Sequence, residues 1–416
     1  MKSITKQFLI SCLLFYIGGC SNKQDIKQIN KSKNVTINVY EPINQTLDSL
    51  SFLAEDINFI KLEYTSVCQL ADRPLNICSI NDYVFITEIN AIYQFDFSGK
   101  FIRRIGYNGR GPGEYPVINS MQVDWSKKLI SVFPGKTEGK IIQYDFRGNL
   151  VREIKIKNRD YTAFDISNKG FIFYPFCFEK FQKNYRKLYV IDEQGNDLIS
   201  FSSSIYPKIR EGSEKVFSYG ATRDWSWKHN DRLYFLEANN DTIFEISGDS
   251  LLITWLLAGK NRLSLREAHF GKPKGYSNDC IRLTDRTIIP ANSCVYETDR
   301  FLLFRCFSNQ KRYFTIYDKQ EEILYRSDYE YQDQEDAKHS DCFLDDLISG
   351  LPFNPVYQIA NNQLAAIFQP YYLLNQKELV RQFYRKHNTS KTKEFLELCN
   401  TLKENDNPVL MIAKMK

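Results

Sequence analysis

Residues 91–105 read AIYQFDFSGKFIRRI, which is an apolar strand, a turn and a second apolar strand. Nearly the same pattern returns as KIIQYDFRGNLVREI at residues 140–154 and as KLYVIDEQGNDLISF at residues 187–201. In each copy an Asp begins the turn and can bond backbone amides ahead of it, and a Gly supplies the positive φ that the turn needs. The pattern therefore predicts three copies of one β-hairpin.

The hairpin recurs with a nearly constant period. Asp96, Asp145 and Asp192 are 49 and 47 residues apart, and weaker copies follow at residues 241–255 and 312–326. Before each copy lies another pair of short apolar strands with its own turn. Four strands in about 45–50 residues form one blade of a β-propeller. Five such units can be recognised, so the predicted fold class is all-β.

A sixth blade is expected to contain both ends of the folded chain. Pro355–Ala360 and Gln363–Phe368 supply two strands, residues 407–416 a third and Ile57–Glu63 the fourth. Pairing the two ends in one sheet removes the exposed edges of an open array. We therefore predict a six-bladed β-propeller with four-stranded blades over residues 51–416.

Two short amphipathic helices are expected as an insertion in this last blade, over about residues 376–404. The candidate helices are Lys377–Lys386 and Lys391–Leu402, in which apolar residues such as Leu379 and Phe383 recur at i,i+4 spacing. We interpret them as part of the propeller and not as a second domain.

The N-terminus carries an export signal. Two lysines precede an apolar run at residues 8–17, and Gly18-Gly19-Cys20 follows. This order is typical of a secretory signal, and a run of about ten residues is too short to cross a ~30 Å hydrocarbon core. A Cys directly after the small residues predicts a signal peptide at residues 1–19 and lipidation of Cys20; the alternative is an ordinary signal peptide with a coincidental Cys. Residues 20–50 are expected to form a flexible tether.

Charge and cysteine content exclude some classes of protein. The formal net charge of +5 is small for 416 residues, and part of it leaves with the signal, so a nucleic-acid partner is not expected. Eight cysteines besides Cys20 remain in the mature chain, with no CxxC pair. We expect each to be a small buried residue. A Cys68–Cys78 bridge is the alternative that an oxidising compartment permits.

The chain resembles the six-bladed β-propeller lipoproteins of gut Bacteroidales, which are related in shape to TolB-like and NHL-repeat propellers. The segments that carry the resemblance are Ile17–Cys20, Phe95–Ile102, Ile105–Tyr115, Asn240–Phe244 and Asn407–Leu410. The resemblance implies a propeller fold and a lipid-anchored position in the cell envelope, at the outer membrane. It implies no particular activity.

The most distinctive candidate site is the glycine-rich segment at residues 106–115. Its four glycines expose backbone amides, and Arg110, Glu114 and Tyr115 could bind a carboxylate or sugar hydroxyls. It is not a phosphate-binding P-loop, because no Gly-Lys-Ser/Thr follows. The alternative is that the glycines shape a tight crossing between blades.

A second candidate is Arg223-Asp-Trp-Ser-Trp-Lys-His229, which alternates aromatic and polar residues along a predicted inner strand. Arg223, Trp225 and Trp227 are candidate ligand-binding residues, because two Trp on one face could form a platform for a sugar ring. The alternative is packing between blades, where large aromatics are common.

Other motifs predict neither catalysis nor a cofactor. The four histidines show no zinc-binding spacing, and no GxSxG segment is present. Acidic pairs such as Asp345-Asp346, and the group Asp333, Glu335 and Asp336, could bind Ca²⁺, but they lack the DxDxDG pattern.

Two hypotheses of function remain. The first is a non-catalytic binding or scaffold lipoprotein that recognises a glycan, a peptide or an envelope protein. The second is a propeller enzyme, a carbohydrate-active or NHL-like lyase or hydrolase, whose site would be assembled across blades.

Overall fold

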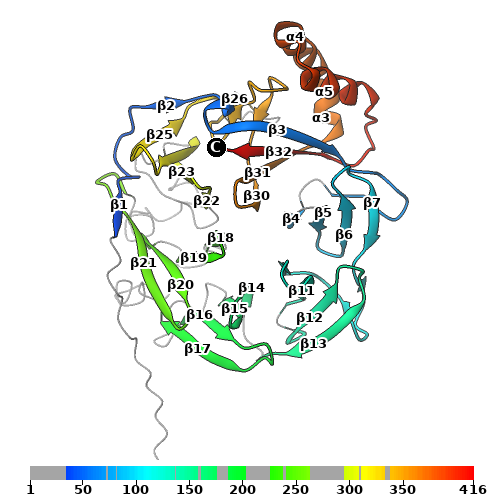
Figure 1. The fold of residues 1–416 in the computed structure, drawn as a ribbon, viewed down its shortest axis with the longest axis vertical. Coiled ribbons are helices and arrows are strands. Elements are labelled where there is room, and N and C mark those ends of the chain that lie inside the picture. Colours follow the sequence, from blue (N-terminus) through cyan, green and yellow to red (C-terminus); the bar gives the residue numbers. More distant parts are fainter. Residues whose placement is uncertain are drawn as a thin grey trace, which may run out of the picture.

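Six blades of four antiparallel strands surround a central axis in the computed structural model (Figure 1). The structure describes residues 34–71, 74–80, 82–135, 137–157, 161–175, 186–202, 225–237, 240–262, 295–308, 311–332 and 338–416. The predicted fold class, an all-β six-bladed propeller, is therefore confirmed. The signal peptide, Cys20 and Arg223 lie outside the described residues.

The blades follow the chain in order, each from its innermost to its outermost strand. Blade 1 contains β4 (Asn76–Ile80), β5 (Tyr83–Thr87), β6 (Ile92–Asp96) and β7 (Phe101–Arg104). Blade 2 contains β10 (Ser120–Asp124), β11 (Leu129–Phe133), β12 (Lys140–Asp145) and β13 (Leu150–Lys155). Blade 3 contains β14 (Tyr161–Ser167), β15 (Gly170–Pro175), β16 (Arg186–Ile191) and β17 (Asp197–Ser202).

Blades 4 and 5 repeat this arrangement. Blade 4 contains β18 (Trp225–His229), β19 (Arg232–Leu236), β20 (Thr242–Ser247) and β21 (Ser250–Leu257). Blade 5 contains β22 (Val295–Glu297), β23 (Phe301–Ser308), β24 (Lys311–Asp318) and β25 (Ile323–Ser327). Short pairs lie between blades: β8 (Tyr107–Asn108), β9 (Glu114–Tyr115), β26 (Tyr331–Gln332), β27 (Lys338–His339), β28 (Phe343–Leu344) and β29 (Pro352–Phe353).

Blade 6 closes the ring with both ends of the chain, as predicted. Its order is β30 (Tyr357–Ala360), β31 (Gln363–Phe368), β32 (Val409–Met415) and β3 (Ala54–Lys61). The C-terminal β32 thus lies between β31 and the N-terminal β3 and bonds to both (Figure 1).

The prediction of a flexible tether as far as residue 50 is wrong for the residues that the structure describes. β1 (Val35–Ile37) pairs in parallel with β21, and β2 (Thr46–Leu47) pairs in parallel with β25. The N-terminal segment therefore runs along the outer edges of blades 4 and 5 before it enters blade 6 (Figure 1). Its apolar side chains bury themselves there; Ile37 is 1 % exposed and Val39 is 1 % exposed. Burial of these side chains offsets the entropy of ordering the chain.

Apolar clusters lie between each pair of neighbouring blades. The cluster around Phe133 and Phe173 joins blades 2 and 3, and that around Phe85 and Met121 joins blades 1 and 2. Four further clusters join the remaining pairs, and the one between blades 5 and 6 extends under the helices. Each blade therefore packs mainly on its two neighbours, which explains how so long a chain avoids a single oversized core.

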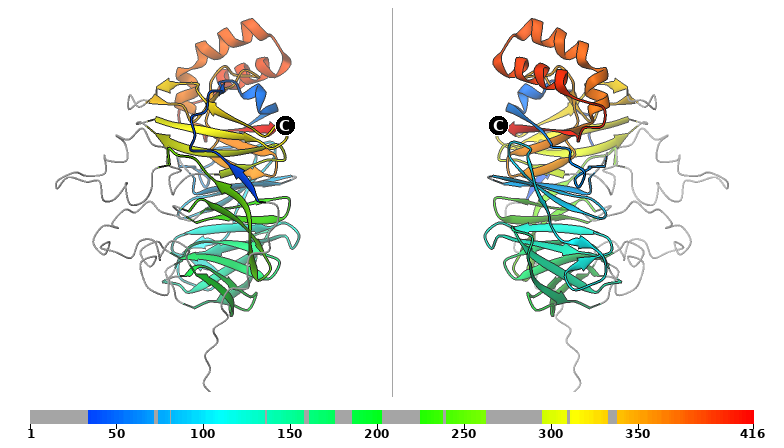
Figure 2. Two further views of the ribbon diagram at one scale, coloured as in Figure 1. Left: turned by 90° about the vertical axis from the view of Figure 1, so that its left-hand side faces the viewer. Right: turned by 90° about the vertical axis from the view of Figure 1, so that its right-hand side faces the viewer.

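A helical hairpin projects from the rim of blade 6 (Figure 2). It consists of α4 (Lys377–His387) and α5 (Ser390–Thr401), preceded by the short α3 (Pro370–Asn375), which we did not predict. Phe395 of α5 packs edge-on against Phe59 of β3, with ring centroids 5.1 Å apart. Leu379, one of the apolar residues at i,i+4 spacing, is 50 % exposed, and the neighbouring Val380 is buried. Among the described residues, no helix has the length and apolar character needed to span a membrane.

The turn of each repeated hairpin has the hydrogen bonds and the positive-φ glycine that its sequence predicts. Oδ1 of Asp192 accepts hydrogen bonds from the amides of Gln194 and Asn196 at 2.9 and 2.7 Å. Asp96 and Asp145 accept the equivalent pairs of amide bonds. The following glycines have positive φ; for example, Gly195 has φ +90°, and a Cβ there would lie 1.9 Å from the Lys155 carbonyl oxygen. The hydrogen bond from the Asn196 amide lowers the pKa of Asp192, and the Ser98 hydroxyl lowers that of Asp96.

These lowered pKa values predict how stability changes with acid. A carboxyl group whose pKa is lower in the folded chain stabilises it above the ordinary pKa, and this contribution is lost as the pH falls through the folded value. We expect the melting temperature to fall on acidification below about pH 4, where Asp is ordinarily half-protonated. A triple variant, D96N/D145N/D192N, should show a smaller fall, measured by calorimetry from pH 5 to 3. Equal falls in both proteins would contradict this role of the turns.

Candidate functional site

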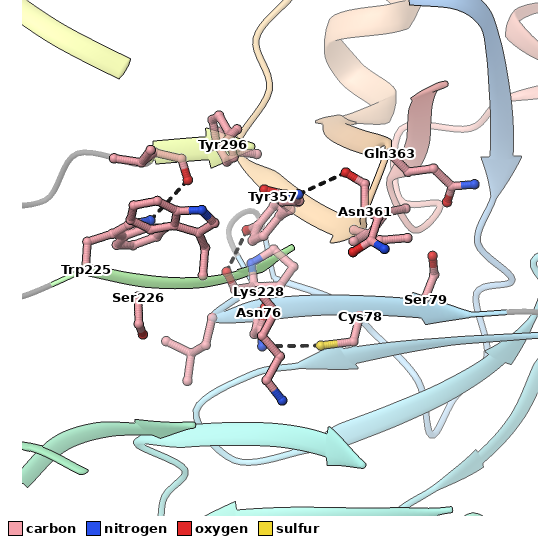
Figure 3. A pocket seen from close by; sticks show the side chains of 18 of the residues that line it. Asn76, Cys78, Ser79, Trp225, Ser226, Lys228, Tyr296, Tyr357, Asn361 and Gln363 are labelled. Carbon is pink, nitrogen blue, oxygen red and sulfur yellow. Dashed lines mark hydrogen bonds between the residues drawn. The ribbon is translucent and has the colours of Figure 1, made fainter. Parts of the chain in front are cut away.

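The innermost strands of all six blades line a central cavity. The described residues that border it enclose about 3020 Å³. Figure 3 shows part of its wall, where side chains from β4, β18, β22 and β30 come together. The lining continues along blade 6 to Tyr371 in α3 and Leu379 in α4. The cavity is therefore both central and extended on one side.

The wall is held rigid by hydrogen bonds between neighbouring inner strands. Tyr357 of blade 6 donates its hydroxyl to the Pro74 carbonyl of blade 1 at 2.7 Å. The Gln122 amide of blade 2 donates to the Phe164 carbonyl of blade 3 at 3.0 Å. Such contacts occur at the other four boundaries as well, through Asn76, Ser226, Trp225 and Gln358. Because hydrogen bonds of this kind cross all six boundaries between blades, the inner strands are held in place relative to one another.

The boundary between blades 4 and 5 explains why the aromatic residues alternate in the sequence. Trp225, Trp227 and His229 face blade 5, because side chains two residues apart in a strand lie on the same side. Their ring nitrogens meet Val295, Glu297 and Asp299 in the same order. Aromatic residues therefore alternate with polar ones because every second side chain of β18 faces blade 5 and contacts one residue there.

Trp227 is a packing residue in this interface. It is 6 % exposed, it stacks on Tyr234 with ring centroids 5.6 Å apart, and its indole N–H donates to Oε2 of Glu297 at 2.7 Å. Glu297 is 2 % exposed and also accepts from Lys319 at 3.1 Å. A buried carboxylate needs such donors, because leaving it unpaired is costly.

Trp225 differs from Trp227 in its exposure. It is half-buried, its indole N–H donates to the Val295 carbonyl at 3.2 Å, and the ring borders the cavity (Figure 3). His229, at the other end of the strand, is buried beside Asp299, and burial lowers its pKa. Of the aromatic candidates, Trp225 thus presents the more accessible ring to the cavity.

The carboxylates of the inner strands already have hydrogen-bond donors. Asp165 accepts from the Tyr174 hydroxyl at 2.9 Å and from Ser226. Asp124 accepts from the Ser126 hydroxyl at 2.7 Å and the Lys127 amide at 3.0 Å. Burial alone would raise the pKa of Asp124, but these bonds and the nearby lysine charges outweigh it, so its pKa is lowered.

Lys228 is the exception among the charged residues of the inner strands. It is the fourth of the five residues of β18, it is exposed, and it borders the cavity near Asn76 and Cys78. Within the described part of the chain, we find no hydrogen bond or ion pair to its ammonium group. The strand that was predicted as an aromatic platform therefore also carries an accessible positive charge at the cavity, which the sequence analysis did not single out.

Amide, hydroxyl and aromatic side chains make up much of the remaining wall. The amides come from three blades and the aromatic rings from three, and they are Asn76, Gln122, Gln358, Asn361, Gln363, Trp225, Tyr296 and Tyr357. Several of these side chains are labelled in Figure 3. Single Asn, Gln and Tyr residues in short strands gave no motif in the sequence, because only the ring brings them together.

The glycine-rich segment does not border the cavity. Tyr115 is fully buried and donates its hydroxyl to the Ile105 carbonyl at 2.6 Å, and Oε2 of Glu114 accepts from the Gly111 amide at 2.8 Å. Arg110 is exposed at the surface. A Cβ at Gly106 would lie 2.6 Å from the Tyr144 hydroxyl, so the crossing between blades 1 and 2 needs glycine there. The geometry thus agrees with the structural interpretation of this loop.

The acidic pair Asp345-Asp346 binds backbone amides of the protein itself, and the two cysteines considered for a disulfide are not bonded to each other. Oδ1 and Oδ2 of Asp345 accept the amides of residues 347–349, and Asp346 accepts the Ser51 amide at 2.9 Å. Asp333, Glu335 and Asp336 lie outside the described residues. In the described ranges, no group of three His, Cys, Asp or Glu residues is placed to hold a metal. Cys68 and Cys78 are free thiols, so the alternative of a bridge between them is wrong.

Comparisons with known proteins agree with the architecture. A protein of Bacteroides fragilis NCTC 9343 that is named as an exported protein matches with a TM-score of 0.67 and 17% identity, over 92% of this chain and 100% of that one. A DUF4221 member from Bacteroides vulgatus matches with a TM-score of 0.48 and 12% identity, over 88% and 97% of the two chains. No curated protein matches the chain. The family model described as a domain of unknown function, DUF4934, matches residues 34–414, and the chain therefore belongs to the DUF4934 family.

Proposed function

We propose that this protein is a lipid-anchored binding protein of the cell envelope, at the outer membrane, whose central cavity holds a saccharide chain. Support for the anchor comes from Cys20 directly after Gly18-Gly19 and from the exported name of the Bacteroides fragilis protein of similar fold. Thirteen residues separate Cys20 from Asn34, and such a segment spans at most roughly 45 Å. The propeller would therefore stay close to the bilayer. Fatty-acid labelling that persists in a Cys20→Ser variant would contradict the anchor.

The size of the cavity supports a chain-like ligand. Its volume of about 3020 Å³ is several times the ~300–1,000 Å³ of sites that enclose a drug-sized molecule. The extension along blade 6 towards α3 gives the ligand a second contact region beyond the ring centre. A monosaccharide would leave most of this space filled with water.

The chemistry of the wall supports a saccharide. Amide side chains both donate and accept hydrogen bonds, which suits the hydroxyls of a sugar, and an accessible Trp ring such as that of Trp225 suits its C–H face. The single observation that carries the proposal is this combination of Trp225 of blade 4 with amides from blades 1, 2 and 6 around one cavity. Peptide and protein partners are the alternative ligands.

A propeller enzyme is less well supported. A general acid for glycosidic cleavage needs a raised pKa. The pKa of Asp124 is instead lowered, and Asp165 already accepts two hydrogen bonds. In the described structure, the carboxylates of the inner strands therefore accept hydrogen bonds that stabilise the cavity wall.

The test is direct binding. The soluble Cys20→Ser mature chain is applied to an array of bacterial, plant and host oligosaccharides, and calorimetry follows each positive result. We expect Trp225→Ala to weaken binding about tenfold, equivalent to ~1.4 kcal/mol. Tyr64→Ala, which removes a half-exposed ring outside the cavity, is the matched control.

A third variant distinguishes the two candidate sites. If Arg110→Ala abolishes binding and Trp225→Ala does not, the ligand contacts the glycine-rich loop and the cavity proposal is wrong. If no oligosaccharide binds, the saccharide proposal fails, and cross-linking in the envelope becomes the way to find a protein partner.

A further inference from the structure

The charge of the cavity wall points to a more specific ligand. In the innermost strands the acidic residues are Asp124, Asp165 and Glu297, and each accepts at least two hydrogen bonds from protein donors. These bonds use Oδ1 of Asp124, Oδ2 of Asp165 and both oxygens of Glu297, so the protein already takes up part of their acceptor capacity. Lys228 offers the opposite: an exposed ammonium group that borders the cavity.

The position of Lys228 is fixed by the strand that carries it. Its neighbours Trp227 and His229 are buried against blade 5, so the backbone of β18 cannot turn without breaking that interface. Ser226, on the same side of the strand as Lys228, is tied to Asp165 of blade 3. The backbone of Lys228 is therefore fixed at the cavity wall by a rigid strand, and its ammonium group is within reach of the cavity.

Groups around Lys228 can complete an anion site. Asn76 lies nearby, and its amide makes only long contacts, 3.4 Å to the Cys78 sulfur and 3.4 Å to the Met121 carbonyl (Figure 3). Such weak bonds are readily exchanged for a bond to an oxyanion. The charge of Lys228 also reaches Asp124 and contributes to lowering the pKa of that carboxyl group, so an anion at Lys228 would lie near a carboxylate as well.

We propose that Lys228 binds the anionic group of an acidic saccharide, either a uronate carboxylate or a sulfate ester, with Asn76 as a second donor. This inference rests on the proposed function, because it names the class of saccharide that the cavity accepts. The shared chemistry is a singly charged oxyanion on a sugar ring, and Trp225 is available on the same strand for the ring itself.

The experiment uses calorimetry of the soluble Cys20→Ser mature chain with three probes. They are oligogalacturonate, a sulfated galactan oligosaccharide that contains no uronate, and a neutral xylo-oligosaccharide of similar length. We expect one of the acidic probes to bind at least tenfold more tightly than the neutral one, and its affinity to fall when salt rises from 0.1 to 1 M, because screening shortens the reach of the charge from about 10 Å to about 3 Å.

Variants assign the charge to one residue. Lys228→Gln should weaken the acidic probe about tenfold and leave the neutral probe unchanged, and Lys228→Arg should restore much of the binding. Lys155→Gln, an exposed lysine on the outermost strand of blade 2, is the matched control and should change nothing. Because Lys228 is exposed, the melting temperatures of these variants should match that of the parent chain.

The outcomes separate this inference from the proposed function. Equal binding of neutral and acidic probes, unchanged in Lys228→Gln, would overturn the anion site and leave the saccharide proposal intact. Failure of all three probes, together with no positive result on the array, would overturn both. Tighter, Lys228-dependent binding of a polyglutamate peptide would overturn the saccharide class. The carboxylate and sulfate probes decide between the two sources of the anion.

Discussion

Replacing Trp227 with alanine is expected to lower the free energy of unfolding by about 3–5 kcal/mol, the usual cost of truncating a buried aromatic residue. The change removes a ring that stacks on Tyr234 and packs in the cluster between blades 4 and 5. It also deprives Oε2 of Glu297 of its 2.7 Å hydrogen bond. A carboxylate that is 2 % exposed would lose one of its donors, which adds to the cost of the cavity left by the ring.

The measurement is chemical denaturation of the soluble mature chain. Unfolding is monitored by far-UV circular dichroism, which reports backbone structure and avoids tryptophan fluorescence as the signal. Trp225→Ala is the matched control, because it removes the same side chain two residues earlier in β18, where the ring is half-buried and borders the cavity. We expect it to cost clearly less than Trp227→Ala. Equal losses would mean that both rings serve packing, and the cavity would then lose its aromatic contact.

The repeat of hairpins could be predicted because its signal is local. Asp192 and Gly195 lie within one turn, and the bonds that they make connect residues four apart or fewer. Such turns fix where each strand ends, and the 49- and 47-residue spacing of the Asp residues fixes the blade. The closure by residues 407–416 followed from the same count, because the last unit lacked strands that only the chain ends could supply.

The site could not be predicted in the same way. Trp225 and Trp227 share one side of β18, which the alternation in the sequence indicates, but their roles depend on Val295 and Glu297, 70 residues later in the chain. No local pattern reveals which of two identical side chains will lie nearer the axis. Lys228 was overlooked for a related reason: a single lysine in a strand usually faces solvent outside the protein, and only the ring turns that position towards the cavity.

The N-terminal segment was predicted wrongly because its overall composition concealed a short strand pattern. Residues after Cys20 are polar and rich in lysine, and this composition is typical of a tether. Val35, Ile37 and Val39 form a short alternating pattern within it, which was too brief to be recognised as a strand. Strands of two or three residues become stable only as additions to an existing sheet edge, here β21 and β25.

Ending the chain at Asn407 is expected to abolish folding altogether. The deletion removes β32, which is bonded to β31 on one side and to β3 on the other, so blade 6 would keep only the pairing of β30 with β31. Five large apolar side chains of β32 are at most 3 % exposed, and they are Val409, Leu410, Met411, Ile412 and Met415. Burying each is worth about 1.5–3 kcal/mol, so their sum is comparable to the ~5–15 kcal/mol by which a native domain is stable.

The loss would not stay within one blade, because β32 carries residues of two apolar clusters. Met411 belongs to the cluster between blades 5 and 6, and Leu410 to the one between blades 6 and 1. We therefore expect the shortened chain to lack a cooperative calorimetric transition and to collect in the insoluble fraction. The double variant Lys414→Ala/Lys416→Ala alters exposed side chains of the same segment and should keep its transition. A shortened chain that melts cooperatively as a soluble monomer would show that the ring does not need closure by the C-terminal strand, and that the remaining blades hold the cavity on their own.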